Sequence, residues 1–198
     1  MEVPLVDVRF GERERKAVEA VLQSGWLTMG SVTAEFESKF KSLVDVKHAI
    51  AVTNGTAALH LAVAALELQP SDEIICTPIT FVASINAIIY CGAKPILADV
   101  ASLDDFSISP SRIVEAITER TKAILVVHYA GFPCDMDKIL DIAETNGLAV
   151  IEDCAHAPGA TYLNRACGAL GDIGCFSFYS NKNITTGEGG MVTTNNKL

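Results

Sequence analysis

Short apolar runs rich in β-branched residues alternate along the chain with segments of helical composition. Seven of these runs predict strands, at residues 49–53, 73–78, 94–100, 123–129, 148–153, 172–178 and 190–195. The first five are almost continuously apolar, which is typical of a sheet buried on both faces. The pattern predicts an α/β fold in which a mixed, mostly parallel seven-stranded sheet lies between helices. Functional sites of such sheets gather at the carboxyl ends of the strands.

Helical segments with recognisable starts separate these strands. Six are expected, at residues 11–24, 32–44, 57–68, 81–90, 111–119 and 136–147. Thr56, Thr80 and Ser109 each precede a segment as a candidate N-cap. Asp135 opens the last segment, and Gly147 closes it as a C-terminal cap.

Composition and charge argue against several classes of protein. The chain is 49% hydrophobic, yet its most apolar stretch is interrupted by polar residues and lacks the run of about 20 apolar residues that a membrane-spanning helix needs. The N-terminus lacks the layout of a signal peptide, so we expect a cytoplasmic protein that does not bind membranes. A net charge of −9 without a basic cluster disfavours a nucleic-acid partner.

The cysteines form no metal-binding or redox pattern. They include no C-x-x-C pair and have no ligand-like spacing with the four histidines. Several lie inside apolar runs, so we expect buried, reduced thiols and no metal site. The six residues are Cys76, Cys91, Cys134, Cys154, Cys167 and Cys175.

The Asn-Gly-Thr turn after the first predicted strand is a candidate phosphate site. Gly55 permits close approach of the backbone to a ligand. The first N–H groups of the following helix are free donors at the positive end of its dipole. An ordinary helix cap is the alternative, and this motif alone does not distinguish the two.

Residues that could take part in catalysis or cofactor binding lie at the ends of two later strands. Glu152 and Asp153 end the strand at 148–153, and pleating sends their side chains to opposite faces, so one is expected to face the site and the other a structural partner. A buried carboxylate needs a cation or several donors, and a helix cap or salt bridge is the alternative. Lys182 follows the next strand, where partial desolvation would lower the pKa of its amine and make it a nucleophile. Ser177 lies near the end of that strand and is a candidate for binding an anionic oxygen.

The phosphate turn, the carboxylate and the lysine together are the groups that pyridoxal 5′-phosphate (PLP) requires. This cofactor binds covalently to a lysine, and an acidic side chain keeps its pyridine nitrogen protonated. The protonated ring then accepts electrons from the carbanion that forms when a Cα proton leaves. The ordered set of motifs therefore predicts a PLP enzyme.

Six motifs also resemble one family of such enzymes. They read SGWLTMG, NGTAALHLAVAAL, TPITFVASINAI, HYAGFPCDMD, VIEDCAHAPGATY and GDIGCFSFYSNKNITTGEGGMV. From about residue 20 to its last residue, the chain resembles the sugar-nucleotide aminotransferases of the DegT/DnrJ/EryC1/StrS family. The resemblance implies the large domain of an aspartate-aminotransferase-like PLP-dependent transferase (fold type I) and a homodimer.

The resemblance also implies roles for individual residues. Lys182 would bind the cofactor covalently and shuttle a proton, and Asp153 would pair with the pyridine nitrogen. His156 would lie near the phenolic oxygen, while Phe81 would stack on one face of the ring and Ala155 would pack near the other. A core position for Phe81 and a structural hydrogen-bonding role for His156 are the alternatives.

The same resemblance assigns the phosphate of the cofactor to the helix start and one strand end. The residues implied are Gly55, Thr56, Ala57 and Ser177. We interpret His128 as structural. Glu188 has no assignment beyond its loop, where it touches substrate or orders the turn.

Lys182 distinguishes branches of the family. Relatives that deoxygenate sugars carry histidine at this place, so the lysine favours a transaminase over a PLP-dependent sugar dehydratase. The implied reaction moves an amino group from an L-amino acid, with glutamate favoured, to a keto group of a nucleotide-linked deoxysugar in amino-sugar and surface-polysaccharide biosynthesis. A 4-keto group is favoured over a 3-keto group, and the sugar and nucleotide are left open.

Family members are generally near twice this length. We expect residues 1–30 to form an N-terminal arm and helix and residues 31–198 to form the PLP-binding large domain, without the family's small C-terminal domain. In relatives, that missing part supplies an asparagine/arginine segment to the partner subunit's cofactor and much of the substrate surface. A catalytically incomplete PLP-binding or dimerising fragment is therefore the alternative to an active enzyme.

Two other functional classes agree less well with the residues. A DNA-binding regulator is opposed by the net charge and by the lack of a basic helix. A dinucleotide-binding domain is opposed by the turn TNGTAALH, which lacks the G-x-G-x-x-G spacing.

Overall fold

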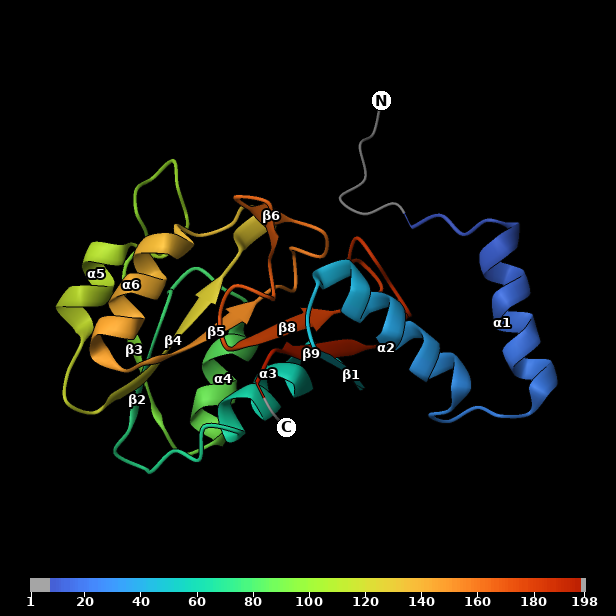
Figure 1. Cartoon of the computed structure of the whole chain (residues 1–198), viewed down its shortest axis with the longest axis horizontal. Coiled ribbons are helices and arrows are strands. Elements are labelled where there is room, and N and C mark those ends of the chain that lie inside the picture. Colours follow the sequence, from blue (N-terminus) through green and yellow to red (C-terminus); the bar gives the residue numbers. More distant parts are fainter. Residues whose placement is uncertain (1–7, 197–198) are drawn as a thin grey trace.

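A mixed sheet of seven strands runs through the centre of the protein (Figure 1). The structure is a computed structural model that describes residues 8–196. Across the sheet the strands follow the order β1 (His48–Val52), β9 (Gly190–Thr194), β8 (Ile173–Ser177), β5 (Ala149–Asp153), β4 (Thr121–Val127), β2 (Glu73–Cys76) and β3 (Lys94–Leu97). All seven strands predicted from the apolar runs are thus confirmed.

Strand direction agrees with the expected mostly parallel sheet. The strands β3, β2, β4, β5 and β8 pair with one another in parallel. β9 is antiparallel to both of its neighbours, β8 and β1. The connection from β8 to β9, residues 178–189, therefore starts at the carboxyl edge of the parallel strands, and it carries Lys182.

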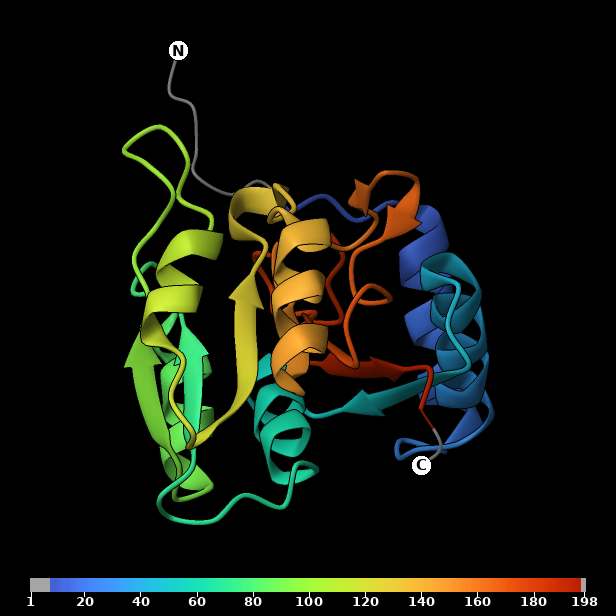
Figure 2. The same ribbon diagram turned by 60° about the vertical axis from the view of Figure 1, so that its left-hand side comes forward.

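Helices cover both faces of this sheet. Their bounds are α1 (Glu12–Ser24), α2 (Ser31–Val44), α3 (Gly55–Ala64), α4 (Val82–Tyr90), α5 (Pro110–Ala116), the short 3₁₀ turn η1 (Tyr129–Gly131) and α6 (Met136–Asn146). Residues of α2, α5 and α6 form one hydrophobic cluster with the sheet, and residues of α3 and α4 form another. Figure 2 shows α5 and α6 side by side on one face. The two clusters bury both faces, as the continuous apolar strands require.

The N-terminal helix differs from the other helices. α1 buries none of its residues, and Figure 1 shows it beside the sheet rather than on either face. Of the N-terminal segment expected at residues 1–30, residues 1–7 lie outside the described residues, as do residues 197–198 at the other end. Within residues 8–196, no helix combines the length and the apolar composition that crossing a membrane needs.

Two predicted helix starts were wrong by one or two residues. Asn54, not Thr56, is the N-cap of α3, because its side-chain oxygen accepts the N–H of Ala57 at 2.8 Å. At α4 the N-cap is Phe81 rather than Thr80. The structure confirms the C-terminal cap at Gly147, which has a φ of 64°.

A short hairpin, β6 (Thr161–Tyr162) and β7 (Arg165–Ala166), was not predicted. Its strands have two residues each, too few to show an alternating pattern. Both residues of its turn, Leu163 and Asn164, have positive φ angles of 46° and 65°. Asparagine commonly adopts this conformation and leucine rarely does, so the turn lacked the usual glycine signal.

The expectation of reduced thiols is confirmed for the six cysteines, whose side chains are free. Five are buried, and Cys91 is partly exposed. Burial raises the pKa of the Cys76 thiol to about 12 and the pKa of the Cys175 thiol well above its ordinary value. These thiols therefore stay protonated and pack as small apolar groups.

The carboxylate of Glu152 joins β5 to the turn that precedes β8. Glu152 is fully buried, and its Oε1 accepts the N–H groups of Leu170 at 2.8 Å and Gly171 at 2.7 Å. Its Oε2 accepts the N–H of Gly168 at 2.9 Å. Three backbone donors therefore compensate the buried charge and fix the turn at the end of the strand.

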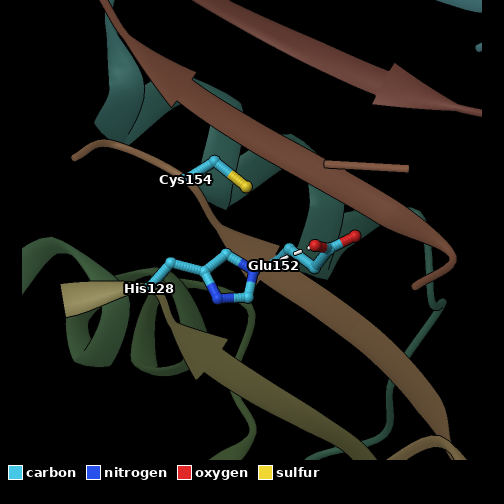
Figure 3. Close-up of side chains that lie close together, drawn as sticks. All are labelled: His128, Glu152 and Cys154. Carbon is cyan, nitrogen blue, oxygen red and sulfur yellow. Dashed lines mark hydrogen bonds and ion pairs between the residues drawn. The ribbon is translucent and has the colours of Figure 1, made fainter. Parts of the chain in front are cut away.

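The fourth donor to Glu152 is the buried ring of His128 (Figure 3). The N–H of Cys134 donates to Nδ1 of the ring at 3.2 Å, so the ring proton lies on Nε2, which is 2.9 Å from Glu152 Oε2. Cys154 lies beside the pair, and the three side chains together offer atoms that a metal ion could bind. Because both ring nitrogens and both carboxylate oxygens already have partners, we interpret this cluster as a structural joint between β4 and β5.

Substitution of Glu152 tests this joint. Glu152→Ala leaves three backbone donors and the His128 ring without their acceptor, so we expect the free energy of unfolding to fall by about 3 kcal/mol or more. Urea unfolding followed by circular dichroism measures the change. Glu144→Ala, on an exposed position of α6, is the matched control and should change the free energy by less than about 0.5 kcal/mol. Equal midpoints for the two variants would contradict the assignment.

Candidate functional site

A cavity of about 600 Å³ opens at the carboxyl ends of the parallel strands. Residues from the start of α3, the start of α4 and the ends of β4, β5 and β8 line it. Eight of the nine predicted site residues meet there: Gly55, Thr56, Phe81, Asp153, Ala155, His156, Ser177 and Lys182. The location agrees with the general placement of sites in parallel sheets.

One predicted residue, Ala57, does not line the cavity. Its N–H donates to the Asn54 side chain and is therefore already engaged. Gly55 and Thr56 are the first residues of α3, and the first N–H groups of a helix have no partner within it. These two residues are thus the better candidates for holding an anion.

Close packing explains why glycines flank this helix start. A Cβ atom on Gly55 would lie 2.8 Å from Cβ of Ser177, the residue that ends β8. A Cβ atom on Gly190 would lie 2.5 Å from the carbonyl carbon of Asn54. The first turn of α3 therefore lies directly against the end of β8 and the start of β9, which brings Ser177 to the same side of the cavity as Gly55 and Thr56.

Asp153 is the buried acid of the cavity, with 5% of its surface exposed. Its Oδ1 accepts the N–H of Ala155 at 3.1 Å, and its Oδ2 accepts the hydroxyl of Ser84 at 2.7 Å. Glu152, the preceding residue, lies in its own network of donors and does not line the cavity. The predicted divergence of the two adjacent carboxylates is therefore confirmed.

Lys182 and His156 lie in the electrostatic field of Asp153. Partial burial lowers the pKa of the Lys182 amine below its ordinary value, and the negative charge of Asp153 opposes this effect. Burial also lowers the pKa of His156, the nearby Lys182 charge adds to this effect, and Asp153 opposes it. A lysine whose pKa is lowered has more of the neutral amine near neutral pH, which is the form that attacks carbonyl groups.

Aromatic side chains form part of the cavity wall. Phe81 has 73% of its surface exposed, which excludes the alternative that it is a core residue. The ring of Tyr129 lies edge-on to the ring of His156, with centroids 6.0 Å apart. Nδ1 of His156 accepts the N–H of Ala130 at 3.4 Å, so the structural hydrogen bond considered for this histidine is present alongside its place in the cavity.

Sequence reasoning missed four polar or aromatic lining residues and left a fifth unassigned. Tyr129, Tyr179 and Asn181 were not singled out, Thr80 was considered only as a helix cap, and Glu188 had no role; all five line the cavity. Each belongs to a segment that leaves the carboxyl end of a strand, and this position was the available signal.

Removing the charge of Asp153 tests the coupling to Lys182. Because the carboxylate opposes the lowering of the lysine pKa, Asp153→Asn should lower that pKa further. The labelling rate of Lys182 by an amine-reactive reagent, followed by mass spectrometry across pH, should rise at lower pH in the variant than in the parent. The exposed Lys41 is the internal control and should label equally in both. A profile for Lys182 that is unchanged or moves to higher pH would contradict the coupling.

Comparison with known proteins identifies the family. A model of the DegT/DnrJ/EryC1/StrS aminotransferase family matches residues 8–198, a longer span than the motifs suggested. GDP-perosamine synthase of Caulobacter vibrioides is 46% identical, with 98% of this chain and 53% of that protein covered. The chain belongs to the DegT/DnrJ/EryC1/StrS aminotransferase family.

Solved structures agree with this assignment. The PLP-form of a putative sugar aminotransferase from Streptococcus pneumoniae superposes with a TM-score of 0.94 at 32% identity, covering 100% of this chain and 54% of that one. PseC of Helicobacter pylori, an aminotransferase involved in the biosynthesis of pseudoaminic acid, superposes with a TM-score of 0.94 at 34% identity, covering 100% and 53%. The fold is therefore that of the PLP-dependent aminotransferases. The chain spans about half the length of the curated relatives it matches.

Proposed function

We propose that the chain binds PLP in this cavity as the cofactor domain of a nucleotide-sugar aminotransferase. The observation that carries the proposal is the meeting of Lys182, Asp153 and the start of α3 in one cavity. An amine, a carboxylate and a group of anion donors are the three protein features that the cofactor needs.

The residues of the cavity fit the charged parts of PLP. The N–H groups at Gly55 and Thr56 and the hydroxyl of Ser177 would hold the phosphate, where the missing Cβ of Gly55 leaves room for the close packing. Asp153, oriented by two hydrogen bonds, would hold the proton of the pyridine nitrogen. Lys182 would form the covalent bond.

The walls of the cavity fit the ring. Phe81 is exposed at the cavity and free to stack on a planar group, and Ala155 offers a small surface for the other face. His156 would lie near the phenolic oxygen. The positions of Phe81, Ala155 and His156 therefore support the roles that the family resemblance implies for them. Ala57, whose N–H binds the Asn54 side chain, is better assigned to the structure of the helix start.

The residues of the chain would then divide the work of transamination. When bound, PLP supplies an electron sink that stabilises the carbanion left after a Cα proton is removed. The Lys182 amine, whose lowered pKa keeps more of it neutral, would accept that proton and return it at the neighbouring carbon. The Asp153 carboxylate would keep the ring nitrogen protonated throughout.

The names of relatives support a sugar substrate for the whole protein. GDP-perosamine synthase is named for a nucleotide-linked sugar, and PseC is named as an aminotransferase of pseudoaminic acid biosynthesis. We extend the proposal to a 4-keto deoxysugar as acceptor, L-glutamate as donor, a homodimer and a cytoplasmic location. Within it, residues 31–198 are the PLP-binding large domain. The presence of Lys182 disfavours a sugar dehydratase.

Reductive trapping tests cofactor binding. The purified chain is incubated with PLP, reduced with borohydride and digested, and the expected result is a phosphopyridoxyl adduct on the peptide that carries Lys182. Lys182→Ala should lose the adduct, because the amine that forms the bond is gone. Lys138→Ala, at an exposed lysine of α6, is the control and should keep it. An adduct of equal yield on Lys182→Ala would contradict the proposal.

The same sample tests amino transfer. Incubation with L-glutamate before reduction should lower the yield of the Lys182 adduct. It should also release 2-oxoglutarate in an amount equal to the adduct that is lost. A trapped adduct that glutamate does not change would support the alternative of a PLP-binding fragment without turnover.

A further inference from the structure

We propose that Ser84 is a positioning residue that sets the orientation of the Asp153 carboxylate, with Thr80 as the outer member of the same hydroxyl pair. This inference rests on the proposed function, because the orientation matters for the ring nitrogen that Asp153 would hold. Ser84 lies in the first turn of α4, 69 residues before Asp153 in the chain. Ser84 lies within the motif TPITFVASINAI, for which the family resemblance implies a role only at Phe81.

The contact is short and fully buried. The Ser84 hydroxyl lies 2.7 Å from Oδ2 of Asp153, and its side chain has none of its surface exposed. On the other oxygen, the N–H of Ala155 donates to Oδ1 at 3.1 Å. One donor on each oxygen fixes the plane of the carboxylate, because rotation about the Cβ–Cγ bond would break both hydrogen bonds.

The donor and acceptor in the Thr80–Ser84 and Ser84–Asp153 hydrogen bonds can be assigned, because each hydroxyl has only one proton to donate. A carboxylate only accepts hydrogen bonds, so Ser84 donates its one proton to Asp153. The Ser84 oxygen then accepts from Thr80, whose hydroxyl oxygen is 2.7 Å away. The carbonyl of Phe81 is a second acceptor for Thr80 but lies farther away, at 3.2 Å. The pair therefore runs from Thr80, which lines the cavity, through buried Ser84 to the acid.

Glu152 and Asp153 differ in how many hydrogen bonds they accept. This difference indicates that Ser84 orients the Asp153 carboxylate rather than only stabilising its charge. Glu152 accepts four hydrogen bonds, which use the capacity of its two oxygens. Asp153 accepts two from the described residues, from Ser84 and Ala155, and so retains capacity for a strong donor in the cavity. A protonated pyridine nitrogen is a donor of that kind.

The same helical turn carries the aromatic wall. Phe81 is the N-cap of α4, and its carbonyl accepts the N–H of Ser84 at 3.1 Å. The ring that would stack on the cofactor and the hydroxyl that orients its acid are therefore three residues apart on one rigid turn. A change at Ser84 should accordingly affect the ring nitrogen without removing any group that touches the cofactor.

Ser84→Ala and Ser84→Thr test the inference on the purified chain. The readouts are the dissociation constant for PLP, from an absorbance titration, and the ¹⁵N chemical shift of PLP labelled at the ring nitrogen, which reports its protonation. Ser84→Ala should weaken binding about tenfold and move the resonance toward that of neutral pyridine, because a charge-assisted hydrogen bond is lost. Ser84→Thr keeps the hydroxyl and should restore the parent resonance.

Two controls separate positioning from stability. Ser109→Ala removes a buried, hydrogen-bonded hydroxyl away from the cavity and should leave both readouts unchanged. If Ser84→Ala does not fold, Thr80→Val removes the outer hydroxyl and should move the resonance in the same direction by less.

The outcomes distinguish this inference from the proposed function. If the parent binds PLP and the Ser84→Ala resonance equals that of the parent, the inference is overturned and the proposed function stands. The same holds if Ser84→Ala only lowers the melting temperature and the affinity, since a purely structural hydroxyl would do that. If the parent binds no PLP, the proposed function fails, and this inference fails with it.

Discussion

The divergence of Glu152 and Asp153 at the end of β5 is the constraint on which the rest of the structure depends. Glu152 turns into the protein, where four donors hold its charge and tie β5 to β4 and to the turn before β8. Asp153 turns into the cavity with only its orientation fixed. The alternating direction of side chains along a strand thus lets one buried charge secure the scaffold while the next remains available for chemistry.

The arrangement of strands supplies the other groups. Parallel strands bring the turn at Gly55, the acid at Asp153 and the hydroxyl of Ser177 to one edge of the sheet, although 122 residues separate the first from the last in sequence (177 − 55). The reversed strand β9 requires a connection across that edge, and Lys182 lies in it. Burial then lowers the pKa of the lysine, and the negative charge of Asp153 limits that shift, so the carboxylate influences the reactivity of the amine.

Much of this could be predicted from the sequence because it depends on patterns along the chain. Apolar runs located all seven strands of the sheet, and strand ends pointed to Gly55, Asp153, Ser177 and Lys182. The family resemblance, not the spacing, supplied the other four expected residues that line the cavity: Thr56, Phe81, Ala155 and His156. The role of Ala57 depended on which residue caps α3, and Asn54 competes with Thr56 for that place through a contact that spacing does not reveal. The Ser84–Asp153 hydrogen bond joins two elements 69 residues apart, and only the packing of α4 against the sheet brings them together.

Urea unfolding of Asp153→Asn, with and without PLP, tests the central claim most directly. A ligand that binds only the folded state raises the free energy of unfolding, and the increase grows with the logarithm of its affinity. The account predicts that PLP stabilises the parent, that the variant without PLP unfolds close to the parent, and that PLP adds little to the variant. An Asp153→Asn protein that is as unstable as Glu152→Ala, or that PLP stabilises as much as the parent, would contradict the division of roles between the two carboxylates.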